Sequence, residues 1–217
     1  MPSASLNSAP TSSFSPQRLA AWCACALLCG YARAQTPVTF FTNGAGWVLN
    51  GSIDNGGPAI LTNRFALTDG VTNQVRSGWY STPVDITSFE VTFLYENVGG
   101  SGGADGVAFV IQNDSDGTAA LGSAGGGLGY EGINDSVAIL INIFEAFGLN
   151  AGINLATAGS LPSAYDLVDP VDLKSGHPIQ VRLRYSGGIL AVRLRDTVTF
   201  DEYTTTYPVD IPAAVGS

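Results

Sequence analysis

Residues 104–113 read Ala104-Asp105-Gly106-Val107-Ala108-Phe109-Val110-Ile111-Gln112-Asn113, so that one acid precedes a nearly continuous apolar run. A second apolar run covers residues 137–144, and the segment 125–130 between them reads Gly-Gly-Gly-Leu-Gly-Tyr. Short apolar runs without alternation are typical of strands that are buried on both faces. We therefore predict two buried strands that bracket a loop poor in side chains, with Asp105 at the start of the first. One carboxylate beside bare peptide groups is suited to binding hydroxyl groups.

Outward from this pair, short β-type runs recur between turns, and no helical periodicity of useful length is present. The expected strands are residues 37–41, 47–49, 59–61, 74–80, 88–95, 106–112, 137–144, 153–156, 179–185, 190–195 and 200–207. With 27 glycines, 11 prolines and only 12% charged residues, the composition favours many short strands joined by tight turns. The sequence predicts an all-β fold, an antiparallel β-sandwich or jelly roll.

The segment 179–195 predicts a hairpin with a two-residue turn at Gly187-Gly188. This register sets Tyr185 opposite Leu190, Leu183 opposite Val192 and Val181 opposite Leu194, which places both apolar rows on one face. It also sets Arg182 opposite Arg193 on the other face, an unfavourable pairing. We expect Asp201, Glu202 or another nearby acid to neutralise these arginines, on a solvated, salt-bridged sheet face.

Residues 1–34 are typical of a secretory signal peptide. Arg18 precedes an apolar run at 19–28, and Ala32-Arg33-Ala34 supplies the small-x-small pattern of a cleavage site. The apolar run is too short to span a bilayer, so we expect cleavage and no membrane insertion of the mature domain, residues 35–217. All three cysteines, Cys23, Cys25 and Cys29, lie in this segment. The mature chain would be secreted or extracytoplasmic and free of disulfides.

Cleavage would also make the chain more acidic. It removes Arg18 and Arg33 but no acidic residue, so the net charge falls from −9 to −11. A chain this acidic does not favour nucleic acid or anionic lipid as a partner. The charge is compatible with neutral sugars.

Several stretches together resemble the legume-type (L-type) lectin domain, in its secreted bacterial version, over roughly residues 38–217. They are Ala104-Asp105-Gly106 with its following strand, the Gly-Gly-Gly-Leu-Gly-Tyr loop, Ser136-Val137-Ala138-Ile139, the segment 172–177 and the segment 209–216. The resemblance implies a concanavalin-like sandwich that binds a glycan or polysaccharide. In this family residue 216 normally leads into further strands, so we expect the last strand or strands of the fold to be missing, together with any C-terminal anchor.

The resemblance also implies a binding site. It assigns to Asp105 a carboxylate that accepts two sugar hydroxyls, often after a cis Ala–Asp peptide, and to Gly126 and Gly127 backbone N–H groups that donate to the same sugar. Asp105 can alternatively be an ordinary turn residue at a strand start, and the loop can be purely structural. Phe144, Phe147 and Tyr130 lie where an aromatic ring could stack on the sugar, although Phe144 is expected to fill the core. Asn142, polar in an apolar strand, is expected to brace the Asp105 loop.

The sequence departs from the plant lectins at their metal site. On the strand that carries Glu-x-Asp in those lectins, Leu140 and Asn142 replace the two acids, and the later ligand positions fall near Ala146 and Asn150. Calcium prefers six to eight oxygens, usually with several carboxylates. We therefore expect no metal and no other cofactor, with calcium as the one remaining candidate.

Enzymatic chemistry is not favoured. A glycosidase needs two converging carboxylates, yet the strand at 137–144 has none and Asp201-Glu202 point to opposite sheet faces. The one histidine, His177, is expected to be a turn residue rather than a catalytic base. We expect a non-catalytic carbohydrate-binding module. The alternative is a structural or adhesive β-sandwich that has a degenerate sugar site and binds a protein partner.

Overall fold

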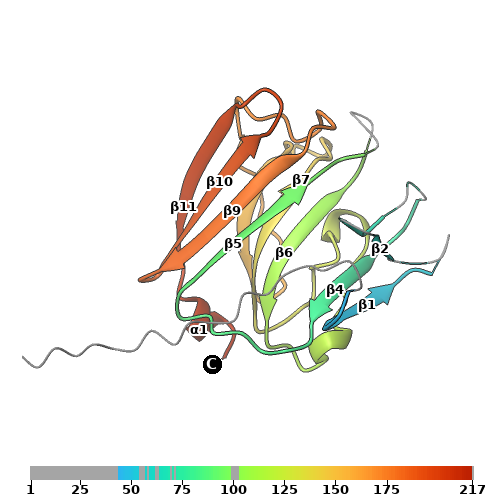
Figure 1. The fold of residues 1–217 in the computed structure, drawn as a ribbon, viewed down its shortest axis with the longest axis vertical. Helices are drawn as coiled ribbons and strands as arrows, with labels where there is room; N and C mark the ends of the chain where they lie inside the picture. Colours follow the sequence, from blue (N-terminus) through green and yellow to red (C-terminus); the bar gives the residue numbers. More distant parts are fainter. Residues whose placement is uncertain are drawn as a thin grey trace, which may run out of the picture. The chain divides into compact units, whose positions relative to one another are not determined.

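The larger of the two main sheets is antiparallel and is built around the expected hairpin. It runs in the order β11 (Glu202–Pro208), β10 (Ile189–Asp196), β9 (Ile179–Ser186) and β5 (Phe89–Tyr95) (Figure 1). In this computed structural model the described residues are 44–53, 57, 59–61, 64–68, 70, 72–98 and 103–216. The signal peptide and the strand expected at 37–41 lie outside them.

The second main sheet has three antiparallel strands, β6 (Gly106–Gln112), β7 (Ser136–Asn142) and β8 (Gly152–Thr157), with β7 in the middle. Every residue of β7 is buried, as its unbroken apolar run predicted, whereas every residue of β6 is only partly buried. The prediction of full burial therefore holds for β7 and is wrong for β6. The strand nevertheless ends at Asn142, two residues before the predicted end. Residues 143–151 therefore form a loop, which lies beside the start of β6.

Two short antiparallel ribbons make up the rest of the β-structure in the described residues. Strand β1 (Trp47–Gly51) pairs with β4 (Arg76–Tyr80), and β2 (Ala59–Leu61) pairs with β3 (Arg64–Ala66). The sequence did not reveal β3. The single turn of helix α1 (Ile211–Ala214) was also not expected; the Asp210 side chain caps it by accepting a hydrogen bond from the N–H of Ala213 at 3.1 Å. None of the described helices is long and apolar enough to cross a membrane.

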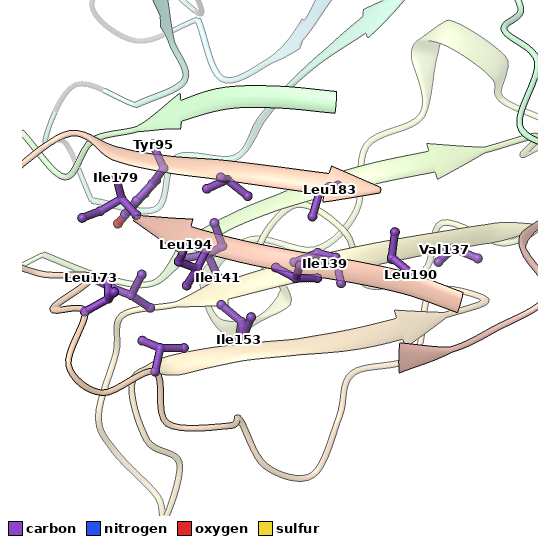
Figure 2. Packing of buried hydrophobic residues seen from close by; sticks show 14 of the residues in the cluster. Tyr95, Val137, Ile139, Ile141, Ile153, Leu173, Ile179, Leu183, Leu190 and Leu194 are labelled. Carbon is purple, nitrogen blue, oxygen red and sulfur yellow. The ribbon is translucent and has the colours of Figure 1, made fainter. Parts of the chain in front are cut away.

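The main core lies between the two large sheets. Alternate residues of β9 and β10, such as Leu183 and Leu194, face alternate residues of β7, such as Ile139 and Ile141 (Figure 2). A second cluster lies on the other face of β7, where Leu140 packs with Leu128 and Tyr130 of the 117–133 segment. The strand is buried on both faces for this reason. An all-β antiparallel sandwich is therefore the architecture, as the sequence predicted.

The hairpin register is also confirmed: Tyr185 pairs with Leu190, and Arg182 pairs with Arg193. The two arginines are neutralised from neighbouring strands. Arg182 Nη2 lies 2.8 Å from Glu90 Oε2, and Arg193 contacts Glu202. Of the two acids named from the sequence it is Glu202 that contacts Arg193, and Asp201 accepts a hydrogen bond from Thr199. This face is the salt-bridged surface that was expected.

Candidate functional site

Asp105 lies at the rim of the three-stranded sheet, directly before β6. Its main chain is fixed, because the Ile143 N–H donates to the Asp105 carbonyl at 2.9 Å and Gly106 pairs with Asn142. The Ala104–Asp105 peptide is cis, as the resemblance implied. The side chain is only half-buried. Within the described part of the chain its carboxylate makes no hydrogen bond and no ion pair, so its oxygens are available to a ligand.

The glycine-rich segment lies against this carboxylate. Gly125–Gly127 form one turn of 3-10 helix, and a Cβ placed on Gly125 would lie 3.6 Å from Asp105 Oδ2. Gly125 and Gly126 are exposed, and a Cβ on Gly126 would meet no atom within 4 Å. Their N–H groups have no acceptor among the described residues. An acid and two free peptide donors therefore meet at one open rim.

The prediction that the Gly127 N–H group donates to the sugar is not supported by its position. It is buried, and its N–H donates to the Ala124 carbonyl at 3.2 Å inside the turn. A Cβ at this position would lie 2.7 Å from Ser123 Cβ and 3.1 Å from Glu131 Oε2. Gly127 thus allows the turn to close tightly, and its N–H group is not free for a sugar.

Tyr130 anchors the end of the glycine loop in the interior of the protein. Its side chain is fully buried, and its hydroxyl accepts a hydrogen bond from the Gly159 N–H and contacts Ser136 Oγ, both at 3.1 Å. Burial is the main reason why the pKa of Tyr130 is raised. Tyr130 is therefore a structural support and not a stacking surface, which corrects that part of the sequence interpretation.

The loop that follows β7 carries two aromatic side chains, Phe144 and Phe147. Phe144 is 40% exposed and Phe147 is 98% exposed. The expectation that Phe144 fills the core is wrong, because β7 ends before it and the chain turns out of the sheet. Both rings belong to the loop whose first residue, Ile143, is hydrogen-bonded to Asp105.

Asn142, the last residue of β7, holds this loop together. Its side-chain Nδ2 donates to the Phe144 carbonyl at 2.9 Å and to the Asn150 carbonyl at 2.8 Å, while its Oδ1 accepts from the Phe144 N–H at 3.4 Å. The residue is only 4% exposed. Asn142 therefore braces the 144–150 loop next to Asp105, and not the Asp105 carboxylate itself.

The residues at the plant lectins' metal positions do not fit a cation. Leu140 has no exposed surface and packs in the apolar cluster with Leu128 and Tyr130. The carbonyl oxygens of Phe144 and Asn150 each accept a hydrogen bond from the Asn142 amide, whose N–H groups therefore lie where a cation would have to be. No group of three or more His, Cys, Asp or Glu side chains is placed to hold a metal ion within the described residues. The expected independence of calcium stays a prediction.

A hollow of about 170 Å³ lies beside the loop. It is lined by Glu145, Ala151 and residues 167–174, and Lys174 Nζ pairs with Glu145 Oε2 at 2.9 Å. Neither Asp105 nor the glycine turn lines it. The candidate site is thus an open rim, not an enclosed cavity.

His177 lies in a turn, as expected. Its Nδ1 is 2.8 Å from Asp196 Oδ2, and Asp196 is 2% exposed. Burial of Asp196 is the largest influence and favours its neutral form, but hydrogen bonds from the Thr199 and Val198 N–H groups and from His177 outweigh it. The pKa of Asp196 is therefore below its ordinary value. This pair joins the 177 turn to the end of β10, which is a structural role.

The Asp196→Asn variant tests this role through the pH dependence of stability. Because the folded-state pKa of Asp196 is depressed, its contribution is present above its unfolded pKa of about 3.9 and is lost as pH falls through the folded value. We expect the variant to be about 1–3 kcal/mol less stable at neutral pH, with a weaker loss of stability on acidification. Urea unfolding at several pH values measures both effects. The exposed Asp116→Asn variant is the control, and equal pH dependence of Asp196→Asn and wild type would contradict the assignment.

Comparison with solved structures identifies the fold. Arcelin-5, a lectin-like defence protein from Phaseolus vulgaris, matches with a TM-score of 0.61 and 20% identity over 81% of each chain. Lectin II from Ulex europaeus gives a TM-score of 0.58 and 17% identity, over 81% of this chain and 82% of its own. The exoplasmic/lumenal domain of VIP36 gives 0.53 and 16%, over 75% of this chain and 71% of its own. No protein-family model matches the sequence.

The protein thus has the concanavalin-like sandwich fold of the L-type lectins. Identities of 16–20% in these three structures establish the fold alone.

Proposed function

We propose that this protein is a secreted, non-catalytic carbohydrate-binding module whose sugar site lies at the rim formed by Asp105 and the glycine turn. The observation that carries the proposal is the half-buried Asp105 carboxylate, which has no partner among the described residues and lies 3.6 Å from the position of a Cβ on Gly125. Solved structures with this fold include the lectin UEA-II complexed with galactose and the lectin I from Ulex europaeus in complex with the methyl glycoside of α-L-fucose. They support a glycan as the class of ligand.

The chemistry of the rim suits a sugar. A carboxylate accepts two neighbouring hydroxyl groups through charge-assisted hydrogen bonds, the stronger kind. The exposed Gly126 N–H supplies a donor, and the absence of a side chain lets the sugar ring approach the backbone. Phe144 and Phe147 lie in the adjoining loop, where a ring can pack on the apolar face of a pyranose. The Gly127 N–H has no part in this arrangement.

Hydrolysis would require a second carboxylate facing the first. Among the described residues, Glu131 also lies against the glycine turn, but at Gly127 rather than at Gly125. We therefore infer binding without catalysis. An assay of reducing-sugar release from polysaccharides tests this inference, and sustained release by the wild-type protein that is lost in Glu131→Gln would contradict it.

A second candidate function is that of an adhesive module that binds a protein partner. The observation that favours it is the near-complete exposure of Phe147, together with the 40% exposure of Phe144. Replacing both rings by serine should leave glycan recognition of the Asp105 rim detectable if the protein is a lectin. The adhesive function is correct if the wild-type protein gives no glycan signal but adheres to protein-coated surfaces, and if the variant with both phenylalanines replaced by serine loses this adhesion.

A glycan array with the Gly126→Val variant tests the lectin function. The Gly126 position is open and its φ is not positive, so valine should fold normally. Its side chain would block the approach of the sugar, and we expect array signals to fall at least about tenfold. The measurement compares array intensity at equal concentrations, with thermal unfolding as the control for fold. Undiminished binding by Gly126→Val would place the sugar elsewhere.

A further inference from the structure

Three polar contacts tie the segment 143–150, in the loop between β7 and β8, to other residues that the structure describes. Its first N–H, on Ile143, donates to the Asp105 carbonyl at 2.9 Å. Its two ends are bridged by the Asn142 side chain, and Glu145 pairs with Lys174 at 2.9 Å. The Glu145 side chain is 58% exposed, so this ion pair contributes little to the stability of the loop. Ile143 also lies in the main core and Leu149 packs against the second cluster. Among the polar side-chain contacts described for this loop, the Asn142 bridge is the buried one.

Asn142 acts as a hydrogen-bond donor at both ends of the loop. A carboxamide has two N–H groups, and Asn142 directs both at backbone carbonyl oxygens, those of Phe144 and Asn150. A carboxylate in place of this carboxamide could not donate these hydrogen bonds. A metal ion at this place would face the positively polarised N–H groups, which cannot act as ligands. Because the residue is 4% exposed, any group left without a partner here would carry the full cost of desolvation.

The neighbouring position on the same face of β7 is also closed to a cation. Leu140 is completely buried, and Leu128 and Tyr130 pack in the same apolar cluster. Apolar side chains offer no ligand to a cation, which would lose its hydration without replacement. The chain thus places an amide bridge and a leucine where the plant lectins carry their acids.

We propose that the Asn142 carboxamide is the positioning residue that assembles the binding rim, so that this site forms and binds its ligand without a metal ion. The inference deepens the proposed function and rests on it for the ligand. The bridge closes the loop that carries Phe144 and Phe147, and the loop in turn holds the main chain of Asp105 through Ile143. The rim is organised before the ligand arrives, which lowers the cost of ordering on binding.

Hydrogen exchange of the 143–150 amides, measured in the purified protein with excess chelator and again with calcium, tests the proposal without a sugar. Asn142→Ser removes the bridge without adding charge, and Asn142→Asp replaces the donors by a carboxylate facing two carbonyls. We expect exchange of these amides to become at least about tenfold faster in both variants. Asn154→Asp is the matched control, because Asn154 on the adjacent strand β8 makes a similar bond, from Nδ2 to the Ala164 carbonyl at 2.9 Å.

In the wild-type protein we expect equal exchange rates, and equal array signals, in chelator and in calcium. Slower exchange in calcium, reversed by the chelator, would overturn the proposal, and so would unchanged exchange in both Asn142 variants. If one variant fails to fold, the other variant and the wild-type calcium comparison still decide. A wild-type protein with no glycan signal but with the expected exchange pattern would refute the proposed function and leave the amide bridge established.

Discussion

Gly106→Ala is expected to destabilise the protein by about 3 kcal/mol or more and to prevent formation of the binding rim. A Cβ at this position would lie 2.0 Å from the Ile141 carbonyl oxygen and 3.1 Å from Asn142 Cα. Both contacts are with backbone of the central strand, which cannot move aside as a flexible side chain would. The φ of Gly106 is +143°, a region that alanine rarely adopts. Backbone strain and overpacking each cost about 1–3 kcal/mol, and here they coincide.

Gly126→Ala is the matched control for this prediction. It is the same chemical change a short way from Asp105, but a Cβ there meets no atom within 4 Å. We expect its unfolding free energy to stay within about 0.5 kcal/mol of wild type. Denaturant unfolding of the three proteins gives the comparison. Equal stability of Gly106→Ala and Gly126→Ala would mean that β6 and β7 do not pair at Gly106 as described.

The sandwich was predictable because its strands carry strong periodic signals. In β9 and β10 the strict alternation of apolar and polar residues, with Gly187-Gly188 between them, fixes both the turn and the register. In β7 the alternation is absent because both faces are covered, one by the other sheet and one by the 117–133 segment. Strand β3 begins with an arginine and has no apolar run to mark it, unlike the equally short β2.

The site was less predictable, because its details depend on how turns close. Three consecutive glycines indicate a loop but do not say which N–H groups the loop uses internally. The Gly127 N–H is used in this way, whereas those of Gly125 and Gly126 have no acceptor in the part of the chain that the structure describes. Tyr130 follows the turn in sequence, yet its hydroxyl is drawn into the fold by the Gly159 N–H, 29 residues later. Such distant partners have no signal in the local sequence.

The end of β7 was misjudged for a related reason. The apolar run continues through Ile143 and Phe144, so hydropathy alone extends the strand to 144. Asn142 ends it, because its side chain competes for the backbone groups of Phe144 and turns the chain away. Asn142, the one polar residue in this apolar run, thus determines where β7 ends. It also determines that Phe144 lies outside the core.

Asp105→Ala is expected to abolish measurable glycan binding while the fold is retained. In the proposed complex the carboxylate accepts two sugar hydroxyls, and hydrogen bonds to a charged group contribute about 1.5–3 kcal/mol each. Loss of both lowers the affinity by roughly 100-fold or more, since 1.4 kcal/mol corresponds to about a factor of ten. The fold should tolerate the change, because the carboxylate has no hydrogen bond or ion pair within the described residues and the Asp105 main-chain contact with Ile143 remains.

Titration calorimetry with the best array ligand measures this loss, and two variants make it specific. Asp105→Asn keeps the shape and one acceptor oxygen but removes the charge, so its affinity should fall between those of wild type and Asp105→Ala. Asp116→Ala removes the same charge from an exposed turn whose side chain makes no capping hydrogen bond, and it should bind like wild type. Because the two alanine variants have equal net charge, a difference between them reports the local contact and not the long-range field of an acidic protein. Equal affinities of Asp105→Ala and the wild-type protein for the ligand would mean that the sugar binds somewhere other than this rim.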